Sequence, residues 1–246
     1  MEEGLGKEEK ARGKTLIDAH VHLRSGFDVK EFFLASRKNL RLHSQEVEKV
    51  TGVLCITDAR GERGYDRIQR FIEDGELEGP IGPGNWEVVP TAENITLSVA
   101  STSGERLVVI AGRQLISNEG LEVLAIGTRE QFGTEESAEA LIREIARHGA
   151  LPILPWGFGK WMGARGRLVK KLVRTPTLPP FFLGDSANRP NLWPRPDHFR
   201  RAEKHGVKNI PGSDPLPFPE EVQRVGNFGG WISGCPDLEK PVEDLK

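Results

Sequence analysis

The chain has few cysteines and no long apolar run. Its only cysteines are Cys55 and Cys235, among 246 residues, so several disulfides cannot hold it together as a secreted scaffold. We therefore expect free thiols and a cytoplasmic protein. No stretch of about 18 consecutive apolar residues is present, which argues against a membrane span. The charged start of the chain does not have the pattern of a secretory signal.

The chain also lacks a strong excess of either charge, with 34 Lys and Arg against 36 Asp and Glu. Such a balance gives no electrostatic reason to expect binding to nucleic acid or to an anionic membrane. The 37% share of hydrophobic residues is too high for a disordered chain. The length suits one α/β domain and leaves the oligomeric state open.

The pattern along the chain predicts three parts. We expect a disordered lead-in at residues 1–14, a single domain at residues 15–235 and a charged C-terminal tail at residues 236–246. Predicted strands cover residues 15–19, 53–57, 86–91, 95–100, 107–111, 121–126, 153–154, 181–183 and 208–210. Predicted helices cover residues 28–38, 44–50, 65–73, 134–149, 165–173 and 198–205. This alternation favours a mostly parallel α/β sheet.

Two histidines, His20 and His22, follow the first predicted strand. Residues two apart in an extended chain point to the same side, so both imidazoles can reach one cation. Alternatively, they are polar residues at a strand end, bonded to backbone carbonyls. Asp214 follows the last predicted strand. It can complete a mononuclear metal site with the histidines, or belong to an ordinary proline-containing turn.

Other polar residues follow the remaining predicted strands, where sites gather in parallel α/β folds. Asp58 is favoured as a helix cap or as a partner of a histidine over a role as a ligand. Lys160 lies in a loop of aromatic residues and glycines that lines a pocket or covers the fold. Asp185 and Arg189 follow the strand at 181–183. The remaining histidines are expected on the surface: His43, His148, His198 and His205.

The order of these motifs resembles the PHP (polymerase and histidinol phosphatase) domain superfamily, over about residues 16–230. Its members are metal-dependent phosphoesterases, so the resemblance implies an α/β fold, a distorted (β/α)7 TIM-like barrel of the PHP type. It also implies that His20, His22 and Asp214 bind metal. Asp28 falls about where the family often carries another ligand. Gln114 stands where the family has a glutamate that bridges two metals.

The chain departs from the family pattern at four ligand positions. Ala59 and Leu216 stand where the family has histidines, Leu154-Pro155-Trp156 has no histidine where a family strand ends in His-Pro, and Gln114 is neutral. Two cations about 3.5–4 Å apart repel each other and need anionic bridges. We therefore expect at most one divalent metal (Zn, Mn or Fe), which is bound more weakly than in the family or is absent.

The resemblance implies a hydrolase that uses a metal-activated water on a phosphoester. Asp58 or Asp185 would act as general base. Lys160, Arg165 and Arg189 would bind a small anionic substrate. Two alternatives stay open. One is a PHP-like domain that has lost catalysis and binds a ligand or partner. The other is an amidohydrolase-like enzyme that cleaves a C–N bond, because that superfamily shares the paired histidines and the late aspartate.

Overall fold

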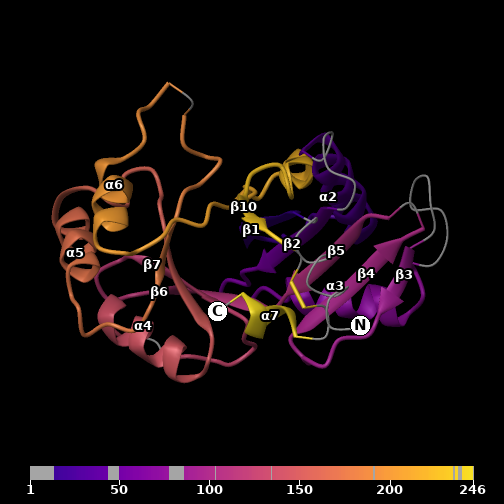
Figure 1. The fold of residues 1–246 in the computed structure, drawn as a ribbon, viewed down its shortest axis with the longest axis horizontal. Helices are drawn as coiled ribbons and strands as arrows, with labels where there is room; N and C mark the ends of the chain where they lie inside the picture. The colour runs from indigo at the N-terminus through magenta and orange to yellow at the C-terminus, as the bar shows by residue number, and fades with distance from the viewer. Residues whose placement is uncertain are drawn as a thin grey trace, which may run out of the picture.

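The computed structural model describes residues 14–43, 50–77, 86–102, 104–133, 135–190, 192–234, 236–237 and 240–245. The strands of these residues form two sheets that lie side by side (Figure 1). The C-terminal helix α7 (Pro241–Asp244) lies between them.

The first sheet has six strands, in the order β10-β1-β2-β5-β4-β3. Their bounds are β1 (Lys14–Val21), β2 (Val50–Ile56), β3 (Trp86–Val89), β4 (Thr96–Ser101), β5 (Arg106–Ile110) and β10 (Gly230–Ser233). The central strands β1, β2 and β5 are parallel. The outer strands β10, β4 and β3 are each antiparallel to their neighbours.

The second sheet has four strands, in the order β6-β7-β8-β9. Their bounds are β6 (Gly112–Ile116), β7 (Glu122–Ile126), β8 (Leu151–Pro155) and β9 (Phe182–Gly184). Only β8 and β9 pair in parallel. A turn at residues 117–120 joins β6 to β7, and Gly120 adopts the positive φ of 73° that such a tight turn requires.

Helices flank both sheets (Figure 1). Helices α2 (Val29–His43) and α3 (Gly64–Glu73) lie on the first sheet, and the 3₁₀ helix η1 (Pro219–Arg224) contacts α2. Helices α4 (Ala138–Arg147), α5 (Gly163–Val173) and α6 (Asp197–Lys204) accompany the second. None of the helices in the described ranges combines the length and the apolar character needed to cross a membrane.

The expected (β/α)7 barrel and mostly parallel sheet are wrong. Within the described residues the strands form two mixed sheets and no closed barrel. The connections explain the difference. Strands β3, β4 and β5 follow one another as antiparallel neighbours, β6 turns back directly into β7, and β10 returns antiparallel to β1. None of these links is the strand–helix–strand crossover that a barrel repeats.

Individual elements agree better with the sequence than their arrangement does. The sequence predicts α4 and the turn before β7, but not strands β6 and β10. Of the helix predicted at 44–50, residues 44–49 lie outside the described residues and Val50 begins β2. Thr134, the predicted cap of α4, also lies outside them. Ser137 caps this helix through its side chain, which accepts a hydrogen bond from the Ala140 N–H.

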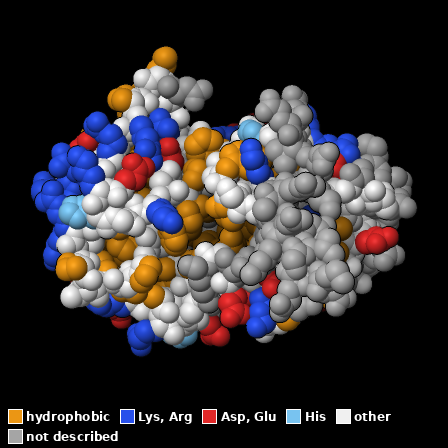
Figure 2. Space-filling model, in the orientation of Figure 1, with side chains coloured by type: hydrophobic (Ala, Val, Ile, Leu, Met, Phe, Trp, Pro, Cys, Tyr) orange, Lys and Arg blue, Asp and Glu red, His pale blue; other side chains and the backbone are white. Residues whose placement is uncertain are grey.

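Strand β2 shows how the core is divided. Its side chains alternate, so that Leu54 and Ile56 join the cluster under α2 and α3, whereas Val53 and Cys55 face the second sheet. Hydrophobic side chains are visible in the hollow between the sheets (Figure 2). The cluster between the sheets consists of Ile17, Ala19, Val53, Cys55, Val108, Ile110, Leu124, Ile126, Ile153 and Val242. Burial on both faces explains the apolar run Val53–Ile56 of β2.

Short bridges join the two sheets where their strands end. Asp58, just after β2, forms an isolated parallel bridge with Arg113 of β6. On the other side, the segment 209–214 runs between β9 and β1. The Ala19 N–H donates to the Pro211 carbonyl, and the Asp214 N–H donates to the His20 carbonyl. These contacts bring the end of β1, the start of β6 and the segment 209–214 to one place.

Candidate metal centre

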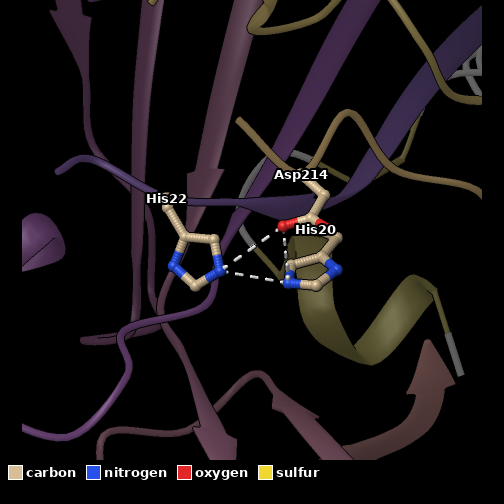
Figure 3. A group of neighbouring side chains, drawn as sticks. All are labelled: His20, His22 and Asp214. Atoms are coloured by element: carbon tan, nitrogen blue, oxygen red, sulfur yellow. Dashed lines mark hydrogen bonds and ion pairs between the residues drawn. The ribbon is translucent and has the colours of Figure 1, made fainter. Parts of the chain in front are cut away.

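Four side chains from three separate segments converge at this place. His20 belongs to β1 and His22 follows its last residue. Gln114 lies in β6, and Asp214 ends the segment that runs beside β1. Figure 3 shows both imidazoles and the Asp214 carboxylate pointing toward one another. The structure thus brings together the paired histidines, the late aspartate and the glutamine expected from the sequence.

The facing atoms are close enough to share one ion. His20 Nε2 lies 3.1 Å from His22 Nε2. Asp214 Oδ1 lies 3.6 Å from the first nitrogen and 3.9 Å from the second. Gln114 Oε1 lies 3.0 Å from His20 Nε2 and 2.9 Å from His22 Nε2. Tetrahedral ligands at about 2.0–2.1 Å from a zinc ion are about 3.3 Å apart, so these separations fit a single metal position.

The protonation of His22 is determined by Glu62, which lies between β2 and α3. His22 Nδ1 is 3.0 Å from Glu62 Oε2, and an ionised carboxylate only accepts hydrogen bonds. Nδ1 therefore carries the proton, and Nε2 faces the cluster with its lone pair. Burial lowers the pKa of His22 and outweighs the opposing hydrogen bond to Glu62, which favours the neutral ring.

The orientation of the Gln114 amide is determined in a similar way. Its Nε2 donates to Glu122 Oε1 at 3.3 Å, so its oxygen faces the histidines. Gln114 Oε1 and His22 Nε2 are then two acceptors only 2.9 Å apart. Two acceptors cannot form a hydrogen bond with each other, whereas a cation between them satisfies both. The donor set therefore fits one divalent metal ion, and imidazole with carboxylate suits Zn²⁺, Mn²⁺ and Fe²⁺.

Asp214 supplies the negative charge of the cluster. Burial raises the pKa of its carboxyl, but His20, His22, Asn188 and Lys160 outweigh this effect and bring the pKa below its ordinary value. Asn188 Nδ2 donates to Asp214 Oδ2 at 3.1 Å and to the Asp214 carbonyl at 2.7 Å. The second carboxylate oxygen is therefore held on the outer side, and Oδ1 faces the histidines.

Asp18 holds the Asp214 segment against β1. Its carboxylate is 1% exposed and accepts hydrogen bonds from the backbone N–H groups of Ser213 at 2.8 Å and Gly226 at 2.9 Å. Burial raises the pKa of Asp18 to about 6, although these hydrogen bonds oppose the shift. Gly212 lies so close to His20 that a Cβ there would clash with the His20 backbone nitrogen. This position requires glycine because two backbones meet.

The other predicted ligand and one predicted general base have structural roles. Asp28 Oδ1 accepts from the Glu31 N–H at the start of α2. The Asp58 carboxylate accepts from the N–H groups of Gly64 and Tyr65, at the start of α3. The position of Asp58 after a strand already favours such a capping role. The structure brings neither carboxylate to the cluster of candidate metal ligands described above.

Asp185 and the predicted substrate-binding residues are also engaged elsewhere. Asp185 is paired with Arg189, at 2.8 Å, and that arginine also donates to the Trp193 carbonyl. Arg165 donates to the backbone carbonyls of two glycines. Lys160 pairs with Glu122 and contributes to lowering the pKa of Asp214, so its charge acts on the cluster.

Two residues of the site, Glu62 and Glu122, are not identified by the sequence. Glu122 could have been found from the β6–β7 turn. In the register of this hairpin Gln114 pairs with Leu124, so Glu122 lies diagonally across from Gln114 on the same face. Glu62 comes from an irregular loop that offers no such periodicity.

A hollow of about 440 Å³ lies elsewhere, at α6 and the end of α5. It is lined by Arg174, Asp197, Arg200, Arg201, Lys204 and His205. Asp197 is paired with both Arg200 and Arg201. Asp197 lies in the first turn of α6 and Arg201 and Lys204 in its last turn, where each charge interacts favourably with the helix dipole. The hollow alone therefore does not define a functional site.

Comparisons with known proteins show the fold and no family. No family model matches the chain, and no curated protein sequence matches it. Among solved structures, the chain resembles PsfC from Pseudomonas syringae PB-5123, with a TM-score of 0.55 and 14% sequence identity. The match covers 95% of this chain and 88% of PsfC. At this identity the likeness concerns the fold alone, and the resemblance to PHP domains stays a prediction.

Proposed function

We propose that this protein is a metal-dependent hydrolase that binds one divalent cation through His20, His22, Gln114 and Asp214. The observation that carries the proposal is the 2.9 Å approach of two acceptors, Gln114 Oε1 and His22 Nε2. A cation held by these atoms makes this contact favourable, as does a proton on His20 Nε2, which lies 3.0 Å from the Gln114 oxygen and 3.1 Å from the His22 nitrogen. The donors match the metal position that the PHP resemblance implies, with a neutral amide in place of the bridging glutamate.

The substrate class is inferred from the charges around the donors. Asp214 is the one anionic donor, and the nearby carboxylates Glu62 and Glu122 are paired with Arg24 and Lys160. A divalent cation in this setting leaves the site with a net positive charge, which favours an anionic substrate such as a phosphoester. When bound, the cation would acidify a water molecule and polarise the bond to be hydrolysed. Lys160, with its side chain 41% exposed, is available to contact the substrate anion.

The proposal includes a cytoplasmic location. It rests on the low cysteine content of the chain and on the burial of Cys55, which raises the pKa of its thiol. A buried thiol with a raised pKa is unreactive, and proteins with few cysteines and no disulfide framework are typical of reducing compartments.

The proposal is tested by metal titration and by turnover. Protein prepared without chelator is titrated with Zn²⁺, Mn²⁺ and Fe²⁺, and each form is assayed on p-nitrophenyl phosphate, bis(p-nitrophenyl) phosphate and a cyclic amide. We expect about one metal per chain and phosphoester hydrolysis with at least one metal. Both should be lost in His20→Ala and retained in His205→Ala, since His205 is an exposed residue after α6.

Each of the other outcomes would favour a different function or overturn the proposal. One bound metal without turnover would favour the non-catalytic PHP-like domain that binds a ligand or partner. Cleavage of the cyclic amide alone would favour the amidohydrolase-like enzyme. No metal binding, or turnover that persists in His20→Ala, would overturn the proposal.

A further inference from the structure

Two similar series of side-chain contacts lead away from the cluster of His20, His22, Gln114 and Asp214. On one side, His22 Nδ1 contacts Glu62, whose other oxygen accepts from Arg24 Nη1 at 2.6 Å. On the other side, Gln114 Nε2 donates to Glu122, which pairs with Lys160. Each series of contacts therefore runs from a neutral candidate metal ligand to a carboxylate and then to a positively charged side chain.

The two neutral donors share a difficulty that these carboxylates resolve. A neutral imidazole has a proton on either ring nitrogen, and an amide can present either its oxygen or its nitrogen. Only the unprotonated nitrogen and the amide oxygen bind a cation. A carboxylate behind each group accepts its N–H and so turns the lone pair of the other atom toward the metal.

Glu122 has the greater effect of the two, because rotation of the Gln114 amide by 180° costs little in shape. In the rotated state the amide NH₂ would face His22 Nε2, donate to it and close the cluster to a cation. Glu122 disfavours that state, since the amide oxygen would then face a carboxylate. The side chain of Glu122 is only 11% exposed, so water replaces this hydrogen bond poorly.

Lys160 keeps Glu122 in this role. A buried carboxylate one hydrogen bond from the donors would itself attract the cation. Its ion pair with Lys160 balances that charge, so that Asp214 remains the anionic donor. The same arrangement on the His22 side, with Arg24 balancing Glu62, supports this interpretation.

We propose that Glu122 is a positioning residue, which fixes the Gln114 amide oxygen toward the cation and thereby determines metal affinity. The inference rests on the proposed metal centre. Glu122 acts through Gln114, so its effect should disappear when Gln114 is removed. This dependence distinguishes a positioning role from a general contribution of Glu122 to folding.

The test is a double-mutant cycle read out by metal binding. Affinities for Mn²⁺ and Co²⁺ are measured for the wild type, Glu122→Gln, Gln114→Ala and the double variant, and the visible absorption of the Co²⁺ forms reports the ligands. Glu122→Gln should weaken binding by roughly 10–100-fold and change the Co²⁺ spectrum. In the Gln114→Ala background it should have less than about a twofold further effect. Glu130→Gln removes an exposed carboxylate after β7 and serves as the matched control.

A charge-swapped variant, Gln114→Glu with Glu122→Gln, keeps the hydrogen bond with donor and acceptor exchanged. It should restore at least wild-type affinity, because the oxygen facing the cation is now anionic. This rescue also shows that position 122 tolerates glutamine in a folded protein.

The possible failures are distinguishable. Wild-type protein that binds neither metal would overturn the metal centre and this inference with it. Wild-type binding that Glu122→Gln leaves within about twofold would overturn the role of Glu122 alone. Equal losses in the presence and absence of Gln114 would also overturn it, since the effect would not pass through the amide.

Discussion

The neighbouring parallel strands β1 and β2 both end in polar side chains, but the two ends have different roles. Beyond β2, the carboxylate of Asp58 accepts two backbone N–H groups at the start of α3. Beyond β1, the rings of His20 and His22 face side chains from other segments. The two ends differ in their surroundings. Helix α3 turns its unpaired N–H groups toward Asp58, whereas the histidines face side chains that arrive from β6 and from the segment 209–214.

This comparison separates two uses of a polar residue at a strand end. A carboxylate that accepts hydrogen bonds from neighbouring backbone N–H groups is buried at a low cost in free energy and stabilises the fold. A side chain whose partners come from distant segments can instead direct a lone pair toward other polar side chains, as His22 Nε2 does. Four substitutions test this separation.

The largest effect is expected at the histidines. His22→Ala removes a donor and should lower metal affinity by at least roughly 100-fold, because even indirect partners of metal ligands contribute roughly 10–100-fold. Titration calorimetry with Zn²⁺ measures the loss, and Asp58→Ala provides the matched control at the end of the neighbouring strand. An equal loss in both variants would contradict the separation.

Substitution of Asp18 should affect both the stability of the fold and the affinity for metal. Asp18→Asn places an NH₂ group against the N–H of Ser213 or Gly226, and an unsatisfied buried donor costs about 1–3 kcal/mol. The free energy of unfolding, measured in urea, should fall by that amount. Metal affinity should fall by about tenfold, since Ser213 precedes Asp214. A variant with unchanged stability would contradict the role of Asp18 in holding the segment to β1.

Asp58 should affect stability alone. Asp58→Ala leaves the first N–H groups of α3 without their acceptor, and loss of such an acceptor costs about 1–2 kcal/mol. Urea unfolding should show this decrease, while calorimetry shows an unchanged metal affinity. Asp58→Asn keeps one oxygen acceptor and should recover part of the stability. Full stability in Asp58→Ala would show that solvent satisfies these N–H groups.

The smallest effect is expected at Asp28, which the PHP resemblance implied as a ligand. Its carboxylate accepts from the Glu31 N–H in an exposed position, so Asp28→Ala should cost about 0.5–1 kcal/mol. The melting temperature should fall slightly, and metal affinity should not change. Any large loss of affinity would show that Asp28 reaches the cluster after all.

The convergence of His20, His22 and Asp214 could be predicted from the sequence. The two histidines are two residues apart, and all three residues come at or after the end of an apolar strand. Gln114 could be placed only through the family resemblance, since glutamine alone does not indicate a metal site. Glu62 could not be predicted, because its contact with His22 depends on the path of an irregular loop.

The arrangement of the strands could not be predicted for a related reason. The apolar run Val53–Ile56 in β2 indicates a strand buried on both faces, but not which strands are its neighbours. The short connection between β4 and β5 allows only an antiparallel pair, but the sequence does not show that β5 lies beside β2 or that β10 lies beside β1. The barrel was inferred from a resemblance, and the pairing of β3, β4 and β10 does not follow it.

Asp214 is also constrained by its own backbone, which has the left-handed φ of 46°. Glycine, asparagine and aspartate adopt this conformation most readily. Of these three, only aspartate brings a negative charge to the histidines, and glutamate would provide charge with a less suitable backbone. A substitution at position 214 therefore changes backbone conformation and charge together. Replacing Asp214 by a residue with a β-branched or bulky side chain would therefore require the backbone of this segment to leave the left-handed region.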